Sequence, residues 1–142
     1  MTKEELKVAG AVLYVCEGTK LRKDNRYKNT YIYNVDFTNS NPKTVILFIR
    51  FLKEILKIDH NKIRVQLFLY QDHDHNELRK HWSSMIGLPQ SQFDKVISLK
   101  SKNSKYKPNP LGTCKIRCYG KDVFQRLQSV IDEVWDKTGI TI

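Results

Sequence analysis

The residue best placed for chemistry is Glu17, an acid that follows a nearly continuous apolar run and directly precedes Gly18. Thr2 and Glu5 have the spacing of a capping box, and Gly18 suits a left-handed helix end, so the pattern predicts a helix over residues 3–17. The carbonyl end of a helix is electronegative, so a carboxylate there costs about 0.3–1 kcal/mol unless a cation or donor offsets it. We therefore expect Glu17 to bind a divalent metal ion.

A second group of potential metal ligands lies further along the chain. These side chains are Asp72, His73, Asp74, His75, Glu77 and His81. Structural zinc sites usually contain a pair of cysteine ligands, and no such pair lies near these side chains. Asp74 or Asn76 is instead suited to cap a helix that follows. We therefore interpret this segment as the beginning of a helix rather than as a metal site.

The chain has three cysteines, Cys16, Cys114 and Cys118. The last two share one face of a predicted strand, which predicts buried thiols rather than a pair of metal ligands. All three lie in apolar elements and no signal peptide precedes them. This pattern predicts a reduced, intracellular location, either the cytoplasm or nucleoid or an organelle matrix.

Length and charge limit the class of protein. The 142 residues predict one domain, 1–142, with a core of its own. A formal net charge of +10 indicates a polyanionic partner, and clustered basic residues favour nucleic acid. No basic amphipathic helix, lipidation signal or long apolar span is present, so we expect no membrane partner.

Hydrophobic periodicity then predicts the elements that must position these residues. Helices are expected at 3–17, 42–57, 74–86 and 121–137, and strands at 29–37, 62–70, 92–101 and 113–119. This order predicts an α+β domain with a curved antiparallel sheet and an inserted helix near Trp82. In the last helix, Val123, Leu127 and Trp135 are expected on the buried side. The face that carries Tyr31 and Tyr33 could belong either to the core or to a groove.

Residues 10–18 resemble the signature motif of the LAGLIDADG homing endonucleases, with Glu17 at the position of the catalytic acid and Gly18 at the closing glycine. The αββαββα order of that family is similar to the predicted order, apart from the inserted helix. The resemblance implies a site-specific endonuclease that cleaves double-stranded DNA with Mg²⁺ or Mn²⁺. One motif in the chain implies a homodimer.

The resemblance also implies which residues would support catalysis. Glu17 and the backbone carbonyl at Gly18 would bind the metal. A basic residue just before the last helix corresponds to Lys121, and a polar residue after the second strand corresponds to Asn41, with Asn39 as an alternative.

In this family the outward face of the sheet forms a saddle over the DNA major groove, where side chains reach phosphates and base edges. The residues expected on that face are Arg64, Gln66, Lys115 and Arg117. The residues expected at the rim are Arg22, Lys23, Arg26 and Lys28.

The first helix is apolar on more than one face, which predicts burial on both sides and a dimer interface. The residues expected there are Gly10, Ala11, Val12, Leu13 and Cys16. Val12 and Cys16 stand where the family usually has small residues, so two helices would approach less closely unless Gly10 and Ala11 provide a shifted contact. A DNA-binding regulator that does not cleave, or an RNA-binding splicing cofactor, therefore remains an alternative to the endonuclease.

Overall fold

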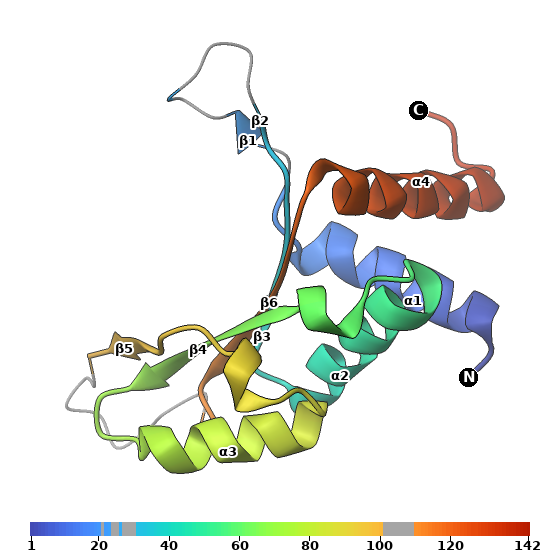
Figure 1. The fold of residues 1–142 in the computed structure, drawn as a ribbon. Coiled ribbons are helices and arrows are strands. Elements are labelled where there is room, and N and C mark those ends of the chain that lie inside the picture. The colour runs from blue at the N-terminus through green and yellow to red at the C-terminus, as the bar shows by residue number, and fades with distance from the viewer. Residues whose placement is uncertain (21, 24–25, 27–30, 101–109) are drawn as a thin grey trace.

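The computed structural model describes residues 1–20, 22–23, 26, 31–100 and 110–142 (Figure 1). Its helices are α1 (Lys3–Glu17), α2 (Pro42–Arg50), α3 (His75–Ile86) and α4 (Lys121–Thr138). Its strands are β1 (Arg22–Lys23), β2 (Tyr31–Ile32), β3 (Asn34–Asn39), β4 (Arg64–Tyr70), β5 (Ile97–Leu99) and β6 (Thr113–Tyr119). Short helical segments are the π-helix η1 (Phe51–Ile55) and the 3₁₀ turns η2 (His60–Lys62) and η3 (Gln90–Gln92). The α+β class is confirmed.

The main sheet has four strands in the order β3-β6-β4-β5. Strand β6 is antiparallel to β3 and to β4, whereas β5 is parallel to β4. The prediction of an antiparallel sheet was therefore wrong for the edge strand β5. The chain crosses over through α3 and η3 before it enters β5, so β5 runs parallel to β4. Strands β1 and β2 pair with each other in a separate ribbon.

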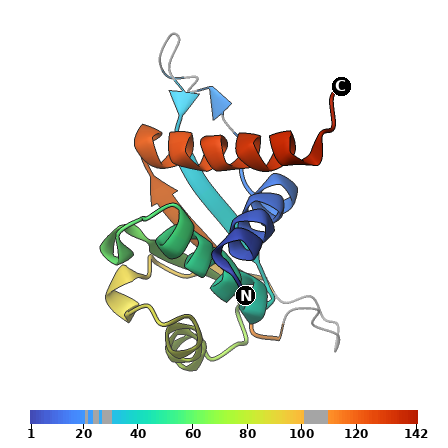
Figure 2. The same cartoon turned by 90° about the vertical axis from the view of Figure 1, so that its right-hand side faces the viewer.

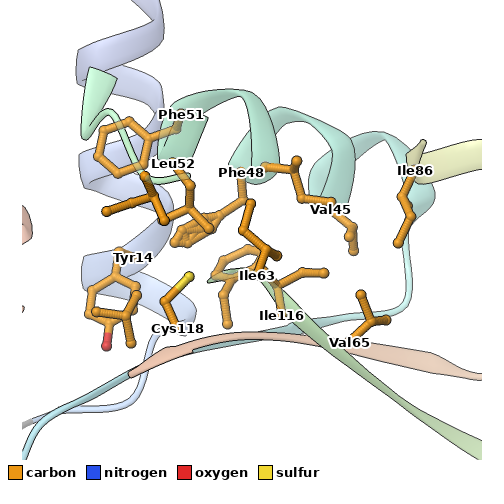
Figure 3. Packing of buried hydrophobic residues seen from close by; sticks show 14 of the residues in the cluster. Tyr14, Val45, Phe48, Phe51, Leu52, Ile63, Val65, Ile86, Ile116 and Cys118 are labelled. Atoms are coloured by element: carbon orange, nitrogen blue, oxygen red, sulfur yellow. The ribbon is translucent and has the colours of Figure 1, made fainter. Parts of the chain in front are cut away.

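The helices α1, α2 and α4 all cover the same face of β3 and β6, and they lie in front of these strands in Figure 2. The alternation of β4 and β6 places their apolar side chains toward these helices, as predicted. The buried members are Val65, Leu67 and Leu69 of β4 and Cys114, Ile116 and Cys118 of β6. Figure 3 shows this core, in which Phe48, Phe51 and Leu52 pack above the strands. Within the described residues, no helix covers the opposite face of the sheet, which we call the open face.

Helix α1 begins and ends where the sequence predicts, and its Thr2–Glu5 capping box is formed. Its buried residues include Gly10, and a Cβ atom at this position would overlap the ring of Phe51. Gly18 does not adopt the predicted left-handed conformation, because the chain continues directly into an extended bridge with Phe37. A glycine is nevertheless required there, since a Cβ atom would overlap the Tyr14 ring.

Three further predictions of secondary structure or burial were wrong in detail. The helix predicted over 42–57 changes after Arg50 into a π-helix, in which the Leu56 N–H donates to the Phe51 carbonyl. The strand predicted over 92–101 is confined to β5. Trp135 is 46% exposed, and the neighbouring Val134 takes the buried position on α4.

The two core cysteines, Cys114 and Cys118, differ from Cys16 in burial. Burial raises the pKa of Cys114 and Cys118, the latter to about 12, whereas Cys16 is exposed. Burial also raises the pKa of Tyr14 to about 12. These groups bind their protons more tightly in the folded state than in the unfolded state.

Two measurements should reflect this difference. In a single chain Cys16 is exposed, so a thiol reagent at neutral pH should modify it before Cys114 and Cys118, whose buried thiolates are disfavoured and should react only after unfolding. A second copy packed on this face of α1 would slow the reaction of Cys16. Between neutral pH and pH 9.0, the ordinary pKa of a thiol, these three groups should leave the melting temperature unchanged, and it should fall as the pH rises toward 12, because unfolding then releases protons. Rapid modification of all three native thiols would contradict this account.

The close approach of α1 to Phe51 generates a second prediction. Alanine in a helix interior is usually better than glycine by about 1 kcal/mol. At Gly10, however, we expect alanine to lower the free energy of unfolding by about 1–3 kcal/mol, because the added methyl overpacks the core. Denaturant unfolding of Gly10→Ala, Phe51→Leu and the double variant would measure the coupling, which should be favourable. A stabilised Gly10→Ala protein would show that the contact is not tight.

Candidate nucleic-acid interface and acidic site

The open face of the sheet carries the side chains that alternate with the core residues. On β4 these include Arg64, Gln66 and Phe68, and on β6 Lys115, Arg117 and Tyr119; on β3 the corresponding residue is Asp36. The register places Arg117 directly between Asp36 on one side and Arg64 on the other. The sequence correctly assigned Arg64, Gln66, Lys115 and Arg117 to a common face.

Arg117 is held by two neighbours on this face. Its Nε donates to Oδ1 of Asp36 at 3.1 Å, and its Nη1 donates to the Tyr119 hydroxyl at 3.0 Å. Burial disfavours the charged guanidinium, but the hydrogen bond with Tyr119 and the negative charge of Asp36 outweigh this effect and raise the pKa of Arg117. The guanidinium is therefore charged and oriented before any ligand binds.

Arg64 is held in the same manner from the other edge. Its Nη2 lies 2.6 Å from Oδ1 of Asp94, its Nε donates to the same oxygen at 3.2 Å, and its Nη1 donates to the Ser91 carbonyl at 3.4 Å. Gln66, the next residue of β4 on this face, donates to the Lys95 carbonyl at 3.0 Å. Lys115 lies over the Phe68 ring, with its Nζ 5.2 Å from the ring centre.

The rim residues are only partly described. Arg26 is exposed, and Arg22 and Lys23 form β1, although their side chains lie outside the described part of the structure, as does Lys28. Residues 20–28 have five basic side chains and one acidic one, and residues 100–107 have four basic side chains and none that is acidic. These two segments hold eight of the ten net positive charges of the sequence, so the excess charge is concentrated in two short stretches of the chain.

Glu17 lies at the border between the helices and the open face. The residue after it, Gly18, bridges Phe37, and the Thr19 N–H donates to the Asp36 carbonyl at 2.9 Å. Because β3 is an outer strand of the sheet, these bonds place the end of α1 along the outer edge of β3. The Glu17 side chain is exposed, and within the described residues it has no hydrogen bond or ion pair.

The electronegative end of α1 already has a cation. The Lys20 ammonium donates to the carbonyls of Val15 at 2.6 Å and Tyr14 at 3.0 Å. The dipole argument for a metal at Glu17 is therefore weaker than expected, since Lys20 supplies the offsetting charge. Elsewhere in the described chain, no group of three or more His, Cys, Asp or Glu side chains is placed to hold a metal.

One carboxylate could nevertheless contribute to a magnesium site that is completed from outside the chain. Mg²⁺ is often bound by one or two carboxylates together with waters and substrate phosphates. Glu17 suits this arrangement, because it is exposed and unpaired among the described residues. Glu17 alone supplies too few ligands for Mg²⁺. A site would fit the ion only if a second copy of the chain and a substrate phosphate supplied further oxygen ligands.

The two supporting residues predicted for catalysis do not converge. Asn41 caps α2 by accepting a hydrogen bond from the Lys43 N–H at 2.9 Å, and it lies beyond the Asn39 end of β3. Lys121 lies beyond the opposite end of β3, with its Nζ 5.7 Å from the centre of the Tyr33 ring. The ends of a six-residue strand are ~17 Å apart, so Asn41 and Lys121 cannot share one pocket with Glu17 in a single chain. The alternative Asn39 also serves this turn, since its side chain accepts a bond from the Asn41 N–H.

Tyr33 and Tyr31 have different environments. Tyr33 packs edge-on against Phe124 of α4, with ring centres 5.7 Å apart, so it belongs with the helices. Tyr31 is exposed on the ribbon. The question that the sequence left open is therefore answered separately for each residue.

Helix α1 presents one apolar stripe outward. Val8 is 40% exposed and Val12 is 45% exposed, and Cys16 continues the same stripe one turn later. We call these three residues the α1 stripe. Gly10 and Ala11 were predicted at a dimer interface, but both are buried in the chain's own core, so they cannot provide the shifted contact. Leu13 is partly buried and packs against the core.

Sequence reasoning missed the two acids that orient the arginines. Asp36 was assigned no role from the sequence alone, and a single acid in an apolar strand was the available signal. Asp94 lies in an irregular segment that the sequence suggested was a strand, so no pattern linked it to Arg64. The acidic and histidine-rich segment does begin a helix, as predicted, since Asp74 caps α3 by accepting from the Glu77 N–H.

Within the described residues, no helix is both long enough and apolar enough to cross a membrane. In comparisons with known proteins, no family model, no curated protein and no solved structure matches the chain.

Proposed function

We propose that this chain is a homodimeric, site-specific endonuclease of the LAGLIDADG type that binds double-stranded DNA on the open face of its sheet. The observation that carries the proposal is the position of Glu17 at the end of a helix with two apolar faces, on the outer edge of β3. One face of α1 is buried in the chain, and the α1 stripe remains available to a second copy.

The dimer would bring the two acidic sites together. If two α1 stripes pack across a twofold axis, the outer edges of both β3 strands face that axis, and each Glu17 lies near it. The two open faces would then form one continuous surface for a duplex with two related half-sites. Val12 and Cys16 would determine how closely the two helices approach.

In this proposal the chain's residues position the phosphodiester and the metal. The Glu17 carboxylates of both copies, with backbone carbonyls at the helix ends, would hold Mg²⁺ or Mn²⁺. When bound, such an ion would polarise the scissile phosphate, assist ionisation of the attacking water and stabilise the leaving oxygen. Lys121 lies against Tyr33 at one end of β3 and would contact a DNA phosphate away from Glu17. Asn41 is assigned no catalytic role because its side chain caps α2.

A DNA-binding regulator that does not cleave is the second candidate. The observation that favours it is the Lys20 ammonium on the carbonyls of α1, which supplies a positive charge beside Glu17 without any metal. Such a protein would use the same open face and the same dimer, but it would not depend on Glu17. The RNA-binding alternative requires preference for a structured RNA over a duplex, which competition binding would measure.

Cleavage tests the enzymatic part of the proposal. A randomised duplex library is incubated with the parent, Glu17→Gln and Glu54→Gln, with Mg²⁺ or Mn²⁺, and both bound and cut sequences are recovered. We expect the parent and Glu54→Gln, which changes an exposed acid on η1, to cut one long, near-symmetric site, and Glu17→Gln to lose cutting by a factor of at least about 100. Specific binding without cutting in all three proteins would favour the regulator, and equal cutting by Glu17→Gln would rule out the mechanism.

The oligomeric state tests the interface. We expect the parent to be a dimer and Val12→Asp to be a monomer, because a carboxylate buried without a partner in an apolar interface is strongly unfavourable. Ile140→Asp is the matched control, since it adds the same charge at another exposed apolar position. Sedimentation equilibrium over a range of concentrations measures all three. A parent that stays monomeric throughout, or a dimeric Val12→Asp protein, would contradict the interface.

A further inference from the structure

Four charged side chains form one row across the open face. In order across the sheet they are Asp36, Arg117, Arg64 and Asp94, two acids flanking two bases. We call this set the charged row. Arg64 and Arg117 are directly opposite in the register of β4 and β6, and each is bonded to the acid on its outer side.

The row has no net charge, although it lies at the centre of the proposed binding face. Like charges directly opposite on neighbouring strands repel, and the flanking acids offset that repulsion. A surface that only attracted phosphates would gain from two unpaired arginines, because affinity from counterion release depends on uncompensated positive charge. Asp36 and Asp94 therefore lower the general attraction of the open face for phosphates, and they fix the direction of the two guanidinium groups.

Each arginine retains hydrogen-bond donors for a ligand. A guanidinium has five N–H donors. Its observed bonds occupy two of them in Arg117, to Asp36 and Tyr119, and three of them in Arg64, to Asp94 and Ser91. Among the described residues, these bonds leave at least two donors on each side chain, which is the number needed for a bidentate contact with the O6 and N7 atoms of guanine.

We propose that Asp36 and Asp94 are positioning residues that hold Arg117 and Arg64 to read guanine bases in the major groove. This inference rests on the proposed binding of duplex DNA by the open face, but it does not require cleavage or Glu17. It assigns specificity to the charged row. General attraction is left to basic residues outside the row, such as Lys115.

Base preference tests the positioning role, because loss of a purely structural residue would weaken binding to all sequences alike. The full chain and its Asp94→Asn, Arg64→Met and Asp136→Asn variants are each used to select from a randomised duplex library. Asp136→Asn is the matched control, since it makes the same change of charge on the exposed end of α4. Thermal unfolding of each variant verifies that it is folded.

We expect the parent to prefer guanine at one position in each half-site. Arg64→Met and Asp94→Asn should lose that preference on the order of tenfold at the same position, whereas Asp136→Asn should retain it. Asp94→Asn should bind unrelated duplexes as well as the parent or better. Asp36→Asn should act in the same way at a second position, that of Arg117.

Three results would overturn the inference. Full retention of the guanine preference by Asp94→Asn, with loss in Arg64→Met, would show that Arg64 needs no positioning. Duplex binding by the parent without any base preference would refute the reading role while leaving duplex binding in place. Failure of the parent to bind any duplex would remove the proposed function together with the inference.

Discussion

Gly10 allows α1 to lie directly against the ring of Phe51, and the position of Glu17 follows from this contact. The contact determines which face of the helix is buried, and therefore which face carries Val12 outward. It also sets the height of the helix above the sheet, so that Gly18 and Thr19 can pair with the edge of β3. A larger residue at Gly10 would move the acid as well as disturb the core.

The sheet separates two kinds of surface. On its inner face, alternate residues of β4 and β6 form a core with α1, α2 and α4. On its outer face, the same alternation presents arginines whose charges are balanced by Asp36 and Asp94. Most of the excess positive charge is carried by two segments, 20–28 and 100–107. Under the proposed function, general attraction to DNA would come from these segments and from basic side chains such as Lys115, and base recognition from Arg64 and Arg117.

Local patterns predicted the elements that are decided locally. The capping box of α1, the alternation of β4 and β6, and the Asp74 cap of α3 all involve residues close together in sequence, and all are confirmed. The parallel pairing of β5 depends on where a long connection returns, which periodicity does not determine.

Features that depend on contacts between distant segments were missed or placed wrongly. Gly10 was assigned to an interface because its partner Phe51 lies far along the chain. Asp94 was overlooked because only the fold brings it to Arg64. The separation of Asn41 from Lys121 was not foreseen, because it depends on their places beyond opposite ends of β3. Glu17 was proposed as a site residue because a lone acid after an apolar run is visible in the sequence itself.

The central claim is that duplex DNA binds to the open face of the sheet beside Glu17. Backbone amide NMR shifts of the full chain, recorded with and without a pool of random duplexes, test it most directly. The account predicts shifts concentrated on β4, β6 and residues 17–20, with α2 and α3 unchanged. Shifts confined to α2 and α3, or no shift at saturating duplex, would contradict it.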